Sequence, residues 1–113
     1  MATQTPVLDT LTEMTAVSIQ NTTLDNRELI LARIGALAAV DAPTVSYLMH
    51  VGAAADAGVT VEDVQGVLIA IAPIVGTARV VSAAMKITDA LGFAIAAITA
   101  ELEEELAAME AEG

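Results

Sequence analysis

The sequence contains no cysteine and no tryptophan, and it has a single histidine. Without cysteine the chain can form no disulfide, no thiolate metal site and no thiol redox centre. One histidine cannot build a metal site alone, because protein metal sites need several converging ligands. We therefore expect no bound metal and no cofactor.

Basic residues are also scarce, with four Lys or Arg against fifteen Asp or Glu, for a net charge of −11 at pH 7. Phosphate backbones need a basic protein surface, so nucleic acid is excluded as a partner, and anionic membrane surfaces are disfavoured. The lack of cysteine fits a reducing compartment. We expect a cytoplasmic protein.

Aromatic residues are limited to Tyr47 and Phe93, although 56% of the chain is hydrophobic. A small domain has too much surface to hide this much aliphatic area, which predicts a homo-oligomer. The longest uncharged run, Val64 to Ala78, is shorter than the ~18–20 residues that cross a bilayer. No basic segment followed by an apolar one opens the chain, so neither a membrane span nor a signal peptide is expected.

Apolar residues recur at helical spacing along the chain, and no stretch alternates as a strand would. The fold class predicted is all-α, with about five to six helices in a single domain over residues 1–113. Residues 1–5 are expected to form a loose arm, and residues 101–113 an acidic helix end. Helices are expected near 6–19, 25–38, 43–57, 60–75 and from 77 almost to the end, the last as one helix or as two joined near 90–92.

Start signals support two of these helices. Asp25 followed by Glu28, and Thr60 followed by Asp63, both fit a capping box, in which two residues satisfy each other's backbone N–H groups.

Further signals mark the other boundaries. Asp41 is expected to cap the third helix, which Gly58 ends in a left-handed conformation. Pro73 should kink or end the fourth helix, close to Gly76.

His50 is the first candidate for chemistry because histidine changes charge near neutral pH. In one interpretation it is a buried or interfacial side chain donating to a carbonyl; in the other it is a general acid/base in a pocket. Its neighbours on the same helix face would be Ser46, Tyr47, Ala53 and Ala54.

Glu28 and two arginines complete the candidate site. Glu28 is either the capping-box partner or a carboxylate that faces the pocket and tunes His50. Arg33 and Arg79 lie in apolar surroundings, where each either pairs within the structure or binds a substrate carboxylate. Ser46 and Tyr47 could contact the same substrate.

Two stretches carry a family resemblance, RELILARIGAL and YLMHVGAAADAGVTVEDVQGVLIAIAPIVGTARVVSAA. Together they resemble the carboxymuconolactone decarboxylase family, whose superfamily includes the alkylhydroperoxidase D-like proteins. The resemblance runs from about Asp25 to Ala90. It implies an all-α fold assembled as trimers or hexamers, and it matches Glu28 and His50 to the family's glutamate and histidine.

The departures from the family pattern limit what can be transferred. The two cysteines of the redox-active branch would fall at Pro43 and Ser46, so the resemblance carries no thiol peroxidase activity. The second histidine of the decarboxylase branch is also missing from 64–75. Two hypotheses follow: a lyase or isomerase acting on a small carboxylated lactone, with His50 as the acid/base, or a non-catalytic ligand-binding or assembly module on the same scaffold.

Overall fold

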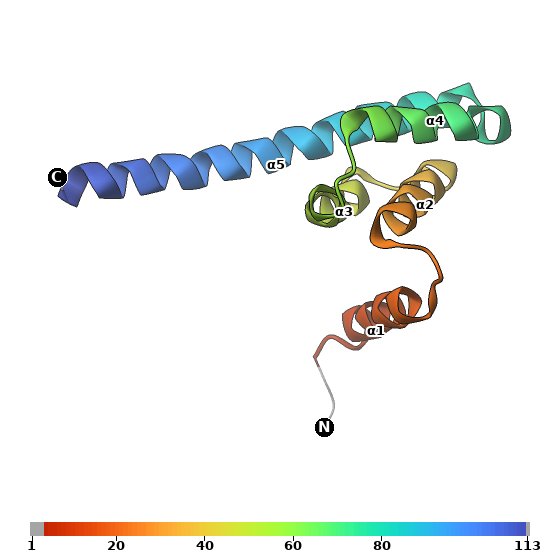
Figure 1. The fold of residues 1–113 in the computed structure, drawn as a ribbon, viewed down its shortest axis with the longest axis horizontal. Helices are drawn as coiled ribbons and strands as arrows, with labels where there is room; N and C mark the ends of the chain where they lie inside the picture. The colour runs from red at the N-terminus through yellow and green to blue at the C-terminus, as the bar shows by residue number, and fades with distance from the viewer. Residues whose placement is uncertain (1–3, 113) are drawn as a thin grey trace.

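The computed structural model describes residues 4–112, and this part of the chain is built from helices without any strand. The all-α prediction is confirmed. In chain order the helices are α1 (Pro6–Asn21), α2 (Asn26–Ala39), α3 (Thr44–Asp56), α4 (Val61–Val75) and α5 (Thr77–Glu112) (Figure 1).

Helices α2 to α5 pack on one another around a small core. α3 packs across α5, α4 runs beside the first half of α5, and α2 contacts α3, α4 and α5 (Figure 1). The core is rich in alanine, whose small side chain lets helix backbones approach closely. Its buried members are Ala38, Ala42, Tyr47, Leu68, Ala83 and Ala90.

Both predicted capping boxes are confirmed. The Asp25 carboxylate accepts the Glu28 N–H at 2.8 Å, and the Glu28 carboxylate accepts the Asp25 N–H at 3.0 Å. Thr60 and Asp63 form the same reciprocal pair at the start of α4. Arg27 also forms an ion pair with Asp63, which joins the starts of α2 and α4.

The expected role of Asp41 as a helix cap is wrong. The N-cap of α3 is Pro43, which has no side-chain oxygen to accept a backbone N–H. Asp41 instead lies in the turn after α2 with a positive φ of 53°, and its carboxylate accepts from Ser82 at 2.7 Å and from Lys86 at 3.0 Å, both on α5. These bonds hold the pKa of the Asp41 carboxyl below its usual value, the Ser82 hydrogen bond first.

The C-terminal ends of α3 and α4 agree more closely with the prediction from the sequence. Gly58 adopts the expected left-handed conformation, with φ of 73°, just after α3. Pro73 lies within α4, which continues to Val75 and ends at Gly76, where φ is 87°. Only glycine adopts such a φ without strain, so the chain turns there into α5.

α5 is one continuous helix of 36 residues rather than two helices joined near residues 90–92. Its first half packs in the core, and its C-terminal half projects away from it (Figure 1). Among residues 4–112, α5 alone is long and apolar enough to span a membrane by length and composition, a test that core helices of soluble proteins also pass.

α1 stands apart from the other helices, below the core in Figure 1. None of its residues is buried. Most of the arm expected at residues 1–5 lies outside the described residues.

Candidate functional site

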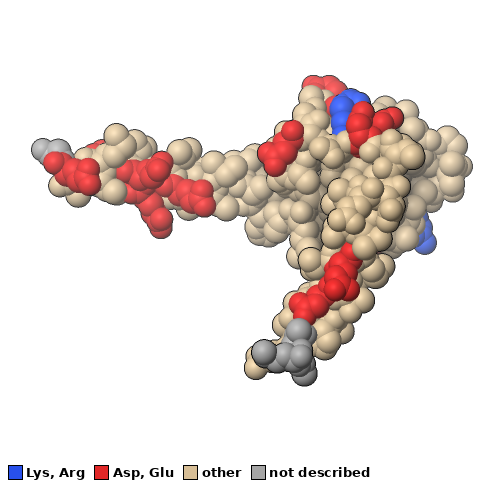
Figure 2. Space-filling view, turned by 60° about the horizontal axis from the view of Figure 1, so that its bottom comes forward, with Lys and Arg blue, Asp and Glu red and all other residues tan. Residues whose placement is uncertain are grey.

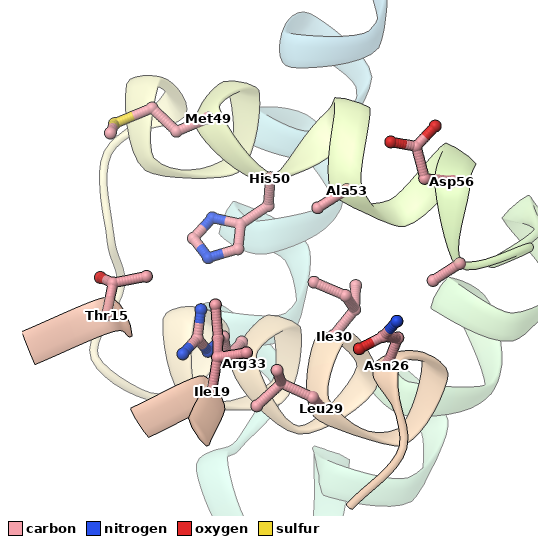
Figure 3. Close-up of a pocket in the computed structure, with 11 residues that line it drawn as sticks. Thr15, Ile19, Asn26, Leu29, Ile30, Arg33, Met49, His50, Ala53 and Asp56 are labelled. Carbon is pink, nitrogen blue, oxygen red and sulfur yellow. The ribbon is translucent and has the colours of Figure 1, made fainter. Parts of the chain in front are cut away.

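A cleft of about 460 Å³ lies between α1, α2 and α3. Its walls are mostly apolar, and two side chains with basic nitrogens, His50 and Arg33, reach into it (Figure 3). The lining residues are spaced three or four apart on each helix, as expected for single helix faces. They are Thr15, Ile19, Asn26, Leu29, Ile30, Arg33, Met49, His50, Ala53, Asp56 and Ala57.

His50 is half-buried on α3, and its ring is held by its own helix. Nδ1 lies 2.7 Å from the carbonyl oxygen of Ser46, one turn earlier. A carbonyl can only accept a hydrogen bond, so Nδ1 carries the proton and, in the neutral ring, Nε2 is the acceptor. Figure 3 shows the ring directed across the cleft toward Arg33. The arrangement therefore presents an oriented base to the cleft.

Arg33 comes from the middle of α2, where it faces both α1 and the cleft. Its Nη2 donates to the Ser18 hydroxyl of α1 at 3.2 Å. A guanidinium has five N–H donors in a planar fork suited to carboxylates. With one donor used by Ser18, Arg33 retains the capacity to bind an anion in the cleft.

A second, smaller cavity of about 60 Å³ lies on the inner side of His50, between α2, α3, α4 and α5. His50 and Tyr47 both line it, and the rest of its wall is aliphatic. The Tyr47 hydroxyl is buried without a hydrogen-bond partner among residues 4–112. Burial, and then the charge of Asp41, raises the pKa of Tyr47, so its hydroxyl stays protonated.

The structure brings together some of the predicted site residues. His50 and Arg33 share the cleft, and Ser46 orients His50 through its backbone carbonyl. Tyr47 borders the inner cavity beside His50.

Glu28 and Arg79 lie outside the cleft. The Glu28 carboxylate is used by the capping box of α2, and Arg79 donates to the carbonyl of Ala39 at the end of the same helix. The structural interpretation of each residue is thus satisfied by a defined contact.

Three polar residues at the edge of the cleft were not predicted from the sequence: Thr15, Asn26 and Asp56. A signal was present for Asn26, which lies seven residues before Arg33 and so close to the same helix face. Asp56 lies six residues after His50, about 120° around the helix, so its spacing from His50 gave no such signal. What the spacing could not show is that α1 forms the third wall.

No cluster of three or more His, Asp or Glu side chains that could hold a metal occurs within residues 4–112. The ionisable side chains that line the cleft are those of His50, Arg33 and Asp56.

The model of the carboxymuconolactone decarboxylase family matches residues 5–90. The chain belongs to this family. The suspected family is confirmed, and the match includes every residue that lines the cleft. Neither the curated proteins nor the solved structures gave a match.

This member of the carboxymuconolactone decarboxylase family has no cysteine and a single histidine. The match also ends at residue 90, so the C-terminal half of α5 lies beyond the family region.

Proposed function

We propose that this protein binds a small carboxylated lactone in the cleft between α1, α2 and α3 and acts on it as a cofactor-free lyase or isomerase. The observation that carries the proposal is that His50 and Arg33 face one cleft with apolar walls. Ligand sites commonly combine an apolar lining with a few converging polar groups. Family membership supports the substrate class.

In this proposal Arg33 holds a carboxylate of the ligand and His50 moves the proton. For decarboxylation, the bond to a second carboxylate breaks and CO₂ leaves with the electron pair remaining on the lactone. The His50 imidazolium then delivers a proton to the lactone carbon and is reprotonated by solvent. For isomerisation, neutral Nε2 removes a proton from one carbon and returns it to another, so no co-reactant is consumed.

A second candidate is binding without turnover on the same scaffold, because a fold does not confer an activity. One observation favours it: the Glu28 carboxylate is committed to the cap of α2, which leaves His50 without that partner. In either case we propose that the protein works as a cytoplasmic homo-oligomer, a trimer or a hexamer, in line with its family.

The test is turnover of carboxymuconolactone, followed as CO₂ release and as loss of the lactone by chromatography. We expect His50→Gln to abolish turnover and to leave the oligomer intact. The matched control is Arg27→Gln, at a half-exposed position outside the cleft. Ligand binding without turnover would select the second candidate, and the absence of both would contradict the proposal.

Glu28→Gln separates the two roles of Glu28, because the glutamine oxygen can still accept the Asp25 N–H. Unchanged turnover would leave Glu28 with its capping role alone, whereas lost turnover in a stably folded variant would assign it a catalytic role as well.

A further inference from the structure

The C-terminal half of α5 carries an apolar face that nothing in the chain covers. Every residue from 95 to 112 is exposed. The large apolar side chains of this segment follow one another at steps of three or four residues and so lie on one face of the helix. We call residues 95–112 the tail, and its exposed apolar residues are Ile95, Ile98, Leu102, Leu106 and Met109.

Several features weaken the tail as an isolated helix. Its 18 residues only slightly exceed the ~12–15 below which isolated helices are marginal in water, and Gly92 weakens the junction by about 1 kcal/mol relative to alanine. Residues 101–112 contain six glutamates and no basic residue. Like charges one turn apart repel, and acidic groups at a helix C-terminus oppose the helix dipole. Burial of the apolar face is the stabilising term that remains.

The solvent-accessible surface of the chain is larger than that of a compact monomer of the same size. Its accessible area is 8073 Å², whereas a compact monomer of this size exposes about 5,800 Å². Its radius of gyration is 17.3 Å, against about 13 Å for a compact chain of this length. The excess is on the order of 2,000 Å² per chain, and a standard interface buries only ~800 Å² per partner. The exposed area is sufficient for a stable contact between copies.

α1 is another segment with many exposed apolar side chains, and its length is close to that of the tail. α1 has 16 residues and the tail 18, which corresponds to about 24 and 27 Å. Within one chain the two segments extend from the core in different directions and do not meet (Figure 1). The large apolar side chains of α1 that are about half or more exposed are Val7, Leu8, Leu11, Met14, Val17 and Ile19.

We propose that the tail of α5 in one copy of this chain packs along α1 of a second copy. Charge favours this pairing over a contact between two tails. Two tails would bring six glutamates from each copy together, whereas α1 carries only Asp9 and Glu13 as charged residues. Figure 2 shows the acidic side chains gathered on the projecting end of α5, with uncharged surface between them.

The pairing would also complete the cleft. α1 forms one wall of the cleft through Thr15 and Ile19, yet within residues 4–112 its side chains make a single hydrogen bond to the core, that between Ser18 and Arg33. A tail packed along α1 would hold this wall in place. The contact between copies does not depend on which ligand the cleft takes.

The absence of cysteine allows a test without background reaction. Met14→Cys on α1 and Leu102→Cys on the tail are co-expressed in the full-length chain, so that oligomers contain both, and a short bis-maleimide is added. We expect a cross-linked dimer containing one copy of each variant. The matched control replaces Leu102→Cys by Glu104→Cys, which lies toward the opposite face of the same helix and should cross-link poorly.

Three results would overturn the proposal. Leu102→Cys alone could cross-link as efficiently as the mixture, which would mean that tails pair with tails. The mixture could give no cross-link above the Glu104→Cys control. The full-length chain could sediment with zwitterionic lipid vesicles through its tail, which would make a bilayer the partner. No ligand enters these readouts, so their failure would leave the proposed function standing.

Discussion

Arg33 on α2 and Ser18 on α1 are joined by a hydrogen bond of 3.2 Å between Nη2 and the serine hydroxyl. This bond crosses the edge of the cleft, and it places the guanidinium where both α1 and a bound anion can be reached. The same arginine is therefore expected to fix a wall of the cleft and to bind the ligand.

Arg33→Gln should weaken the binding of a carboxylated lactone. A hydrogen bond to a charged group contributes about 1.5–3 kcal/mol, so we expect Kd to rise about tenfold to a hundredfold. Isothermal titration calorimetry with carboxymuconolactone measures the change. Arg27→Gln is the control, because Arg27 pairs with Asp63 outside the cleft. Equal affinities of the two variants would contradict the role of Arg33.

Tyr47→Phe should raise the stability of the protein in the absence of ligand. The Tyr47 hydroxyl is buried and unpartnered among the described residues, and such a group costs about 1 kcal/mol or more. Denaturant unfolding should therefore give a free energy of unfolding higher by about 1 kcal/mol. A variant less stable than the wild type would show that the hydroxyl has a partner, such as a bound water. If the hydroxyl contacts the ligand from the inner cavity, affinity will fall in the same variant.

Protonation of Asp63 should lower the stability of the folded protein in acid. Hydrogen bonds from Thr60, the backbone bond first, hold the pKa of the Asp63 carboxyl below 3.8, and nearby Arg27 adds to this. Because the pKa is lower in the folded state, the carboxylate stabilises the fold above the unfolded pKa, and this stability is lost as pH falls through the folded value. Asp63→Asn should lower stability at neutral pH and flatten the decline below roughly pH 4. Chemical denaturation across this range measures both effects.

A carboxylate without an ion pair provides the comparison. Asp89→Asn, on the exposed side of α5, should leave both neutral stability and its acid dependence close to the wild type, since no salt bridge involves Asp89 within residues 4–112. If the stability of Asp63→Asn fell with pH as steeply as that of Asp89→Asn, the proposed contribution of the Asp63 carboxylate would be contradicted.

The helices could be predicted from the sequence because their signals are local. Capping boxes at Asp25 and Thr60 and the glycine at 58 act within a few residues of their own positions. Asp41 was predicted wrongly for the same reason: its sequence context resembles a cap, but its partners Ser82 and Lys86 are about forty residues away. A contact across that separation depends on how helices pack, which spacing does not specify.

The candidate site likewise combines a local feature that the sequence predicts with a long-range contact that it does not. His50 was identifiable as the single histidine, and its contact with Ser46 follows from helical geometry. The sequence did not show which residues of α2 lie near His50, because that depends on which face of α2 packs toward α3. In the structure this face brings Arg33 rather than Glu28 into the cleft. Both residues lie on one helix five positions apart, where their side chains point in different directions.

The state of the His50 ring tests the central claim most directly, and the single histidine makes its ¹⁵N signals unambiguous. We predict that Nδ1 is protonated in the neutral ring, that the Nε2 signal shifts when carboxymuconolactone is added, and that Arg33→Gln abolishes this shift. A neutral ring protonated at Nε2, or an Nε2 signal unchanged by the ligand, would contradict the proposed role of His50 in the cleft.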